Sequence, residues 1–201
     1  HSPKGSGIWM SILLRPQIHP MSASMLTLVA AMAVYDAISS RVEGCAIKWP
    51  NDIVIDGRKV CGILTEMSSE LDNIHYVVIG IGINVNTDDF PVDIASVATS
   101  MHVITGAYYK RAEIIADIWK AFEKYYDLFV QTENLVLMVD TYNQRLVNMD
   151  RRVMIEERGH RYEGTARGID AEGGLLVERD DGTTTSVISG EVSVRGILGY
   201  V

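Results

Sequence analysis

The sequence has few cysteines, no long uninterrupted apolar run and no excess of positive charge. Two cysteines, Cys45 and Cys61, are too few for a disulfide framework, and no cysteine–histidine group has zinc-ligand spacing. The most apolar stretch, residues 21–38, is broken by polar side chains, whereas a membrane span needs roughly 18–20 apolar residues in succession. The first residues lack the hydrophobic core of a secretion signal. These absences predict a soluble protein in the reducing cytoplasm.

The charge balance is acidic. The chain has 18 basic and 26 acidic side chains and a net charge of −8. Nucleic-acid affinity comes largely from basic side chains that neutralise phosphates, so this segment is not expected to bind nucleic acid. With 201 residues, 47% of them apolar, the chain can form one medium domain or a larger domain followed by a small one.

The residue pattern changes near residue 148. Before that point we expect strands and helices of one α+β domain, with strands over 7–14, 46–49, 53–55, 59–67 and 74–85 and helices over 22–42 (capped by Ser22 or Ser24), 114–129 and 134–147. After it, short strands alternate with glycine-containing turns, which is typical of a small antiparallel barrel. The sequence therefore predicts a domain over 1–148 and a β domain over 149–201.

A polar cluster interrupts the strands of the first domain. Residues 48–52 read Lys-Trp-Pro-Asn-Asp, and Lys59 follows an Asp-Gly hairpin turn. Polar groups beside buried strands cost free energy unless a partner uses them, and an anionic small molecule is the natural partner here. The pattern taken alone favours the alternative of a solvated hairpin lysine for Lys59. For Asn51 and Asp52 the alternative is a polar turn that bonds its own backbone.

A second pattern lies in the expected strand 74–85. Side chains alternate along a strand, so Gly80, Gly82 and Asn84 share the face opposite to the neighbouring isoleucines. Two glycines on one face predict a flat trough for a ligand, and the Asn84 amide suits the edge of adenine. The alternative is a glycine-weakened strand at a tight packing point. The third glycine and following helix of a dinucleotide fingerprint are missing.

Three segments in order, residues 48–62, 80–86 and 190–195, resemble the biotin protein ligases. The resemblance implies a mixed β-sheet flanked by helices, as in class II aminoacyl-tRNA synthetases and biotin ligases, followed by a small SH3-like barrel. It also implies an ATP-dependent enzyme that makes biotinyl-5'-AMP and transfers biotin to a lysine of a biotin carboxyl carrier protein. Biotin and ATP are the implied ligands, with Mg²⁺ accompanying ATP and no metal-ligating set in the protein.

The same resemblance assigns roles to individual residues. Lys59 would touch both the biotin carboxylate and the α-phosphate, with Lys48 and Asp52 as further catalytic residues. The implied biotin site comprises Lys59, Gly62, Ile63, Gly80, Ile81, Gly82 and Ile83. The implied ATP site comprises Asn51, Asp52, Asn84, Ser2, Pro3 and Arg195.

Two of these assignments have alternatives. An edge-strand arginine on the surface explains Arg195 equally well. Strict alternation puts Gly62 and Lys59 on opposite faces of their strand, so either the Gly62 backbone contacts biotin or a bulge intervenes.

The family normally has a glycine- and arginine-rich loop, a tryptophan, a Ser/Thr-Asn segment and a glutamine before the position of His1. These features are not among the 201 residues. Such a loop closes over the adenylate and excludes water, so we expect the chain alone to have little or no ligase activity. A DNA-binding winged helix, present in some members, also falls outside this sequence.

Two other functions remain open. One is a non-catalytic regulator that binds biotin or its adenylate, and the other is a lipoate-type ligase. The residue string 48–52 and the expected barrel favour biotin. Homodimer formation through an exposed sheet edge is a further expectation.

Overall fold

The computed structural model describes residues 3–71, 73–157, 160–188, 192–196 and 200–201. The strands are β1 (Ile8–Leu14), β2 (Cys45–Lys48), β3 (Asp52–Ile55), β4 (Arg58–Glu70), β5 (Asn73–Ile83), β6 (Arg152–Glu157), β7 (His160–Ile169), β8 (Leu175–Glu178), β9 (Thr184–Val187) and β10 (Val192–Gly196). The helices are the 3₁₀ helix η1 (Pro20–Met25) and the α-helices α1 (Leu26–Ser39), α2 (Met101–Thr105), α3 (Arg111–Thr132) and α4 (Val139–Asn143).

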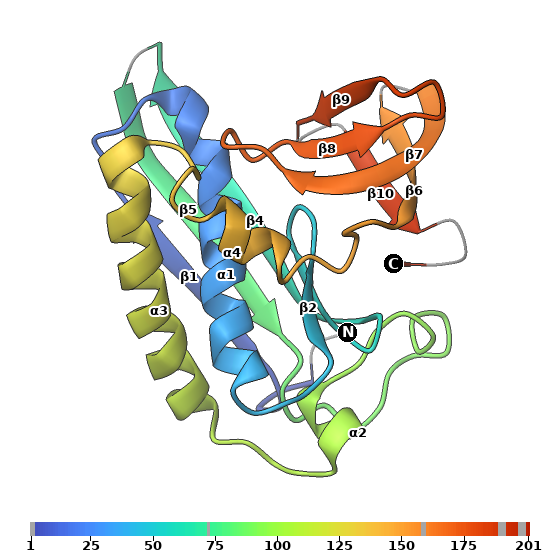
Figure 1. Ribbon diagram of the computed structural model, residues 1–201. Helices are drawn as coiled ribbons and strands as arrows, with labels where there is room; N and C mark the ends of the chain where they lie inside the picture. The colour runs from blue at the N-terminus through green and yellow to red at the C-terminus, as the bar shows by residue number, and fades with distance from the viewer. Residues whose placement is uncertain (1–2, 72, 158–159, 189–191, 197–199) are drawn as a thin grey trace.

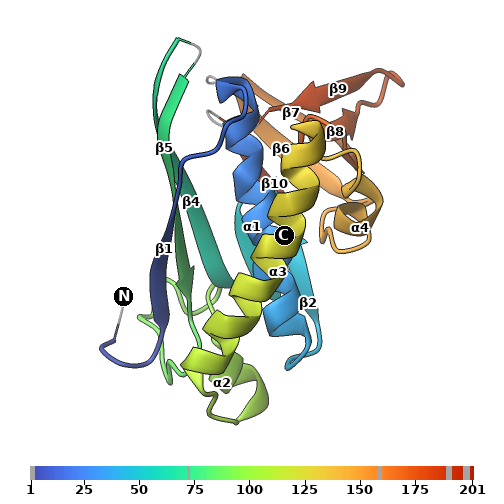
Figure 2. The same ribbon diagram turned by 90° about the vertical axis from the view of Figure 1, so that its left-hand side faces the viewer.

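The first sheet has the strand order β1-β5-β4-β3-β2, and α1 and α3 cover one of its faces (Figures 1 and 2). The predicted α+β class is confirmed. All pairings between the named strands are antiparallel, and parallel pairing occurs at two isolated bridges, Ile47 with Leu146 and Lys59 with Ala98. Short hairpin connections along β2 to β5 account for the antiparallel order.

The predicted hairpin turn is confirmed. Asp56 and Gly57 join β3 to β4 and have φ angles of 49° and 75°, both in the left-handed region. A two-residue type I′ turn requires this conformation at both positions, which explains the Asp-Gly sequence. The turn fixes the register in which Lys59 enters β4.

Helix α1 is the central core helix, and ten of its fourteen residues are buried, packed between the sheet and α3. The stretch Pro20–Ser39 is long and apolar enough to cross a membrane by length and composition, and 67% of its most apolar 18 residues are buried within the fold. Packing in the core accounts for this composition. The predicted serine cap is wrong, because the His19 ring caps η1 by accepting from the Met21 amide and α1 begins only at Leu26.

Helix α3 has the amphipathic pattern expected of it, with Ile114, Ile118, Phe122, Tyr125 and Phe129 buried. The predicted helix over 134–147 is wrong.

Only Val139–Asn143 of that segment is α-helical, because its backbone bonds partners outside the segment. Leu135 donates to the Ala171 carbonyl at 2.7 Å, and Val147 donates to the Ile47 carbonyl of β2 at 2.8 Å.

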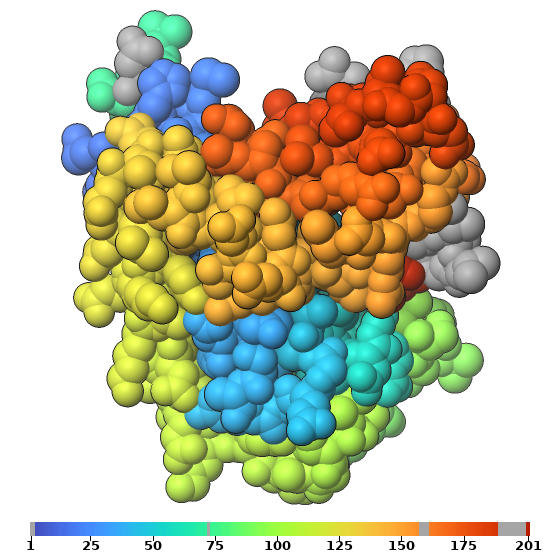
Figure 3. Space-filling model, viewed as in Figure 1, coloured from blue at the N-terminus to red at the C-terminus, as the bar shows by residue number. Residues whose placement is uncertain are grey.

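The second sheet has the order β10-β6-β7-β8-β9 and is antiparallel throughout, as in an SH3-like barrel. It packs against the first domain (Figure 3). The buried Trp49 indole donates a 3.0 Å hydrogen bond to the Gly173 carbonyl, so the start of the polar cluster is anchored to this domain. The division at 148/149 stays a prediction.

Candidate active site

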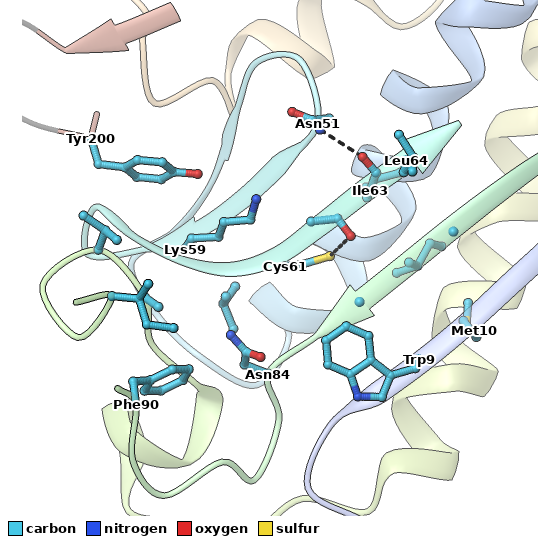
Figure 4. Close-up of a pocket in the computed structure, with 18 of the residues that line it drawn as sticks. Trp9, Met10, Asn51, Lys59, Cys61, Ile63, Leu64, Asn84, Phe90 and Tyr200 are labelled. Carbon is cyan, nitrogen blue, oxygen red and sulfur yellow. Dashed lines mark hydrogen bonds between the residues drawn. The ribbon is translucent and has the colours of Figure 1, made fainter. Parts of the chain in front are cut away.

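A cavity of about 840 Å³ lies on the face of the first sheet opposite to α1 and α3. Cavities of this size accommodate small-molecule ligands, which typically occupy roughly 300–1,000 Å³. Its walls come from β1, β4, β5, the loop after β5 and the last residues of the chain (Figure 4). Its two ends differ, with Trp9 and the β5 glycines at one end and Lys59 and Tyr200 at the other.

The glycine end confirms the predicted alternation along β5. Ile79, Ile81 and Ile83 are buried, while Gly80 and Gly82 line the cavity. A Cβ atom added at Gly80 would have only the Leu64 carbonyl within 4 Å, at 3.6 Å. The floor of the predicted trough is therefore open at Gly80.

The floor at Gly82 is covered, which corrects the predicted two-glycine trough. Trp9 pairs with Gly82 across β1 and β5, and a Cβ at Gly82 would come within 2.6 Å of the indole ring. The indole thus takes the place of a Gly82 side chain and forms a wall. The sequence alone does not indicate Trp9, because its pairing with Gly82 depends on the register of two distant strands.

The isoleucines predicted to bind biotin lie differently from one another. Ile63 and Ile81 line the cavity, although each residue is only 2% exposed. Ile83 is fully buried in the core and does not line the cavity. Its position contradicts a side-chain contact with biotin, because alternation turns it toward the helices.

The charged end centres on Asp52 and Lys59. The Lys59 ammonium lies 2.5 Å from Asp52 Oδ1, and the Tyr200 hydroxyl donates to Asp52 Oδ2. The Lys59 side chain is 40% exposed toward the cavity and that of Asp52 only 9%. A buried carboxylate is thus held between a phenol and a lysine that faces the cavity.

Lys48 lies beside this group. It pairs with Asp52 across β2 and β3, and the residue is buried. Its ammonium lies 4.2 Å from the centroid of the Tyr200 ring, within the range of a cation–π interaction. The structure therefore brings together all three predicted catalytic residues.

A β-bulge places Lys59 and Gly62 on the same face of β4. Lys59 pairs with Val54 and Cys61 with Ile53, so Val60 is an extra residue in β4. A Cβ at Gly62 would lie 3.1 Å from both Lys59 Cε and Nζ. The bulge alternative is confirmed, and glycine at position 62 leaves room for the lysine head.

The two predicted nucleotide-binding asparagines both line the cavity. Asn51 Nδ2 donates to the Ile63 carbonyl at 2.9 Å, and Asn84 Nδ2 donates to the Thr99 carbonyl at 3.1 Å. Asn51 therefore bonds the backbone of β4 and not that of its own turn. Both amides are fixed, with their side chains at the cavity wall.

Of the remaining predicted ATP-site residues, Ser2, Pro3 and Arg195, the structure describes the surroundings of Pro3 alone. The Pro3 carbonyl accepts a 3.0 Å hydrogen bond from Ser6 Oγ, and Pro3 does not line the cavity. Ser2 lies outside the described residues. Arg195 lies on β10 opposite Met154, and its side chain also lies outside the described part of the structure, so its role stays a prediction.

Burial determines the protonation of the phenol and the thiols. Burial, and then the Asp52 carboxylate, raise the pKa of Tyr200, so its hydroxyl stays protonated and donates. Burial raises the pKa of Cys45 to about 12 and that of Cys61 further still. Neither thiol is therefore a thiolate nucleophile at neutral pH.

Sequence reasoning missed several cavity residues besides Trp9. Tyr200 reaches the site from beyond β10, and Phe90, Ile94, Val97 and Ala98 line it from the loop after β5. Lys59 N donates to the Val97 carbonyl at 2.7 Å, so the loop pairs with β4 beside the catalytic lysine. Among the described residues, no group of three or more His, Cys, Asp or Glu side chains could hold a metal ion.

Two family models match the chain. The biotin/lipoate A/B protein ligase family matches residues 1–84, and the biotin protein ligase C terminal domain matches residues 149–195. The biotin–[acetyl-CoA-carboxylase] ligase of Mycobacterium tuberculosis is 30% identical over 192 residues, covering 92% of this chain and 68% of that protein.

The bifunctional ligase/repressor BirA of Bacillus subtilis is 40% identical over 185 residues. That match covers 90% of this chain and 57% of the relative, so the chain spans little more than half of that protein.

The structural likeness extends over nearly the whole chain. The Aquifex aeolicus biotin protein ligase in complex with biotin and ATP is 27% identical, with a TM-score of 0.84, and covers 95% of this chain and 79% of that one. The resemblance carried by residues 48–62, 80–86 and 190–195 is confirmed. The chain belongs to the biotin protein ligase family.

Proposed function

We propose that the chain is catalytic machinery of an ATP-dependent biotin protein ligase, which activates biotin as biotinyl-5'-AMP and transfers it to a carrier lysine. One observation carries this proposal. A lysine ammonium, Lys59, faces a cavity of about 840 Å³ at the end opposite to an apolar, glycine-floored surface. The arrangement suits a ligand with an apolar ring system and a carboxylate.

The open floor at Gly80, walled by Trp9, is the proposed seat of the biotin rings. Apolar contacts to Trp9 and Leu64 would stabilise the bound rings, since both side chains are more than half exposed in this structure. Asn84 would contact adenine and Asn51 the phosphate region. Roles for Ser2, Pro3 and Arg195 beside the nucleotide remain predictions.

In the first half-reaction, a biotin carboxylate oxygen attacks the α-phosphorus of ATP. The bond from that phosphorus to the oxygen bridging to the β-phosphate breaks, and pyrophosphate leaves. Lys59, placed between the two anions, lowers their repulsion and stabilises charge that develops on the α-phosphate. Asp52 holds the ammonium at 2.5 Å and so orients it before the reactants bind. Lys48 adds a second positive charge beside the same carboxylate.

In the second half-reaction, the amine of the carrier lysine attacks the acyl carbon and AMP leaves. The attacking amine must lose a proton, and Asp52 is the carboxylate at this end of the cavity that would accept it. Mg²⁺ would enter with the ATP phosphates, because the described residues offer no cluster of three ligands.

The proposed partner is a biotin carboxyl carrier protein. Two relatives are named for acetyl-CoA carboxylase, which motivates a carrier of that or a related carboxylase. We propose a cytoplasmic location, because the two cysteines are both free and too few for a disulfide framework, which fits a reducing compartment. Homodimer formation at a sheet edge and the lack of nucleic-acid binding by this segment remain predictions.

The test compares two proteins, the 201-residue chain and a loop-bearing version. In the loop-bearing version the family's upstream segment precedes His1, with its glycine- and arginine-rich loop, tryptophan, Ser/Thr-Asn segment and glutamine. Each is incubated with biotin and ATP, and biotinyl-5'-AMP and labelled carrier are quantified by mass spectrometry. We expect the loop-bearing version to make adenylate and biotinylate the carrier, and the chain alone to do so at less than about one tenth of that rate, because its adenylate is open to water.

Other outcomes identify the alternatives. Tight biotin binding by calorimetry without adenylate in either protein would indicate a regulatory binder. Labelling of a carrier by lipoate in preference to biotin, in a direct competition, would indicate a lipoate-type ligase. Robust transfer by the 201 residues alone would contradict the requirement for the upstream loop.

A further inference from the structure

Tyr200 is the residue at the charged end that the mechanism above does not use. We propose that Tyr200 is a positioning residue of the ligase, whose hydroxyl fixes the Asp52 carboxylate and whose ring covers the Lys48 ammonium. The inference rests on the proposed function and deepens it. It makes the end of the chain, beyond the C-terminal barrel, part of the catalytic centre.

The two oxygens of the Asp52 carboxylate have different partners. Lys59 binds one carboxylate oxygen at 2.5 Å, and the Tyr200 hydroxyl donates to the other. When biotin and ATP bind, the Lys59 ammonium must donate hydrogen bonds to them as well as to Asp52. Asp52 then keeps Tyr200 as a partner and stays where it can hold the lysine and meet the incoming amine. A charge-assisted hydrogen bond of this kind is among the stronger ones in proteins.

The ring contact acts on the neighbouring strand. Lys48 and Asp52 face each other across β2 and β3, and the Lys48 ammonium lies 4.2 Å from the Tyr200 ring centroid. One aromatic residue therefore contacts a lysine on β2 through its ring and a carboxylate on β3 through its hydroxyl. The next residue, Val201, lies against the β3–β4 turn, where a Cβ at Gly57 would meet it at 3.0 Å.

The environment of the phenol suits a donor that does not titrate at neutral pH. Burial and the Asp52 carboxylate both raise the pKa of Tyr200, which keeps the hydroxyl protonated. A general base would need the opposite shift. Tyr200 also lines the cavity, so the competing interpretation is a residue that occupies the ligand's place and inhibits the enzyme.

Substitutions separate the hydroxyl from the ring. In the loop-bearing version, we expect Tyr200→Phe to lower kcat for adenylate formation about tenfold, as for loss of a hydrogen bond to a charged group, while KM for biotin changes less than about twofold. Tyr200→Leu also removes the ring and is expected to lower kcat about 100-fold. Rapid-quench measurement of biotinyl-5'-AMP supplies both constants.

Tyr125→Phe is the matched control. Its hydroxyl also donates to an aspartate, Asp36 Oδ2, at 2.7 Å, but it lies on α3 behind the sheet. This substitution should leave kcat and KM unchanged. If it lowers kcat as much as Tyr200→Phe does, the Tyr200 effect is one of general stability and the inference fails.

A second measurement uses the 201-residue chain and needs no activity. Acetylation of lysines by a water-soluble acylating reagent is followed by peptide mass spectrometry, with the exposed Lys110 as internal reference. We expect Tyr200→Leu to raise the Lys48 rate relative to Lys110 at least about fivefold, because the covering ring is removed, and Tyr200→Phe to leave it unchanged. Unchanged Lys48 protection in Tyr200→Leu would overturn the ring contact.

The outcomes distinguish this inference from the proposed function. If the unmodified loop-bearing version makes no adenylate, the proposed function fails, and the positioning role with it. If that version is active and Tyr200→Phe retains more than half of its kcat, only the inference fails. A rise in kcat for Tyr200→Phe or Tyr200→Leu would instead establish inhibition by Tyr200.

Discussion

The two ends of the cavity are built in different ways. At the apolar end, neighbouring strands β1, β5 and β4 bring Trp9, Gly80 and Leu64 together through ordinary sheet register. At the charged end, β2, β3, β4 and the last residues of the chain each contribute a group. The apolar end therefore belongs to one sheet, whereas the charged end also depends on how the C-terminal part packs.

This difference suggests that one end of the cavity determines ligand binding and the other determines the chemical step. The apolar end offers surface and one open glycine, which affects how tightly a ring system binds. The charged end offers two ammonium groups around one carboxylate, which affects how anionic reactants meet. Substitutions at the apolar end should change KM, and substitutions at the charged end should change kcat.

The largest effect is expected for Lys59→Ala in the loop-bearing version. Loss of one preorganised cation or donor at developing charge lowers kcat by about 10²–10³-fold. We expect this loss in adenylate formation, measured by rapid quench. Lys110→Ala is the control, since Lys110 is an exposed lysine whose partner is Glu113. Adenylate formation by Lys59→Ala at an unchanged rate would remove Lys59 from the mechanism.

Asp52→Asn should have the next largest effect. The amide keeps the shape but removes the charge that orients Lys59, and we expect kcat for adenylate formation to fall about 10–100-fold. Transfer from preformed biotinyl-5'-AMP to the carrier should fall as well, because the proton acceptor is lost. If transfer is unaffected while adenylate formation falls, Asp52 orients Lys59 but does not accept the proton.

At the apolar end, Gly80→Ala should raise KM for biotin about tenfold with kcat unchanged, since one added methyl group alters such a pocket by roughly 1–3 kcal/mol. The fold should tolerate the change, because the new Cβ would lie 3.6 Å from the Leu64 carbonyl, an ordinary contact.

Gly82→Ala is the informative companion. Its Cβ would come within 2.6 Å of the Trp9 ring, so the indole must move and stability should fall. Equal thermal stability of the two alanine variants would show that Trp9 does not cover Gly82.

The smallest expected effect concerns pH and stability. Because the pKa of Tyr200 is raised in the folded protein, the unfolded chain releases this proton first as the pH rises above about 10. The folded state then binds more protons, so stability from Tyr200 is present below pH 10 and is lost as the pH rises. The difference in unfolding free energy between the unmodified protein and Tyr200→Phe should shrink from pH 9 to pH 11 in denaturant titrations. A constant difference would contradict a buried, donating phenol.

The parts of this site that the sequence predicted are those encoded locally. The face shared by Gly80, Gly82 and Asn84 follows from alternation along one strand, and the Asp-Gly turn before Lys59 follows from its φ requirements. Both were confirmed. The family resemblance added the roles of Lys48 and Asp52, which composition and spacing left open.

The parts that the sequence did not predict depend on long-range packing. The cover over Gly82 requires the register of β1 against β5, and the Tyr200 contact joins residues 148 positions apart. The segment 134–147 has a helical pattern, but amides near its two ends, Leu135 and Val147, bond Ala171 and β2 instead. In each case tertiary partners replaced the local preference.

The central claim is that the two ends act separately, with Lys59 acting in the chemical step and Gly80 in binding. The most direct measurement is a double-mutant cycle for kcat/KM of biotin-dependent adenylate formation, using Lys59→Ala, Gly80→Ala and the double variant. Effects of independent sites add to within about 0.5 kcal/mol, and we predict that the double variant shows this sum. A double variant no worse than Lys59→Ala alone would show that the two ends act as one unit and would contradict the account.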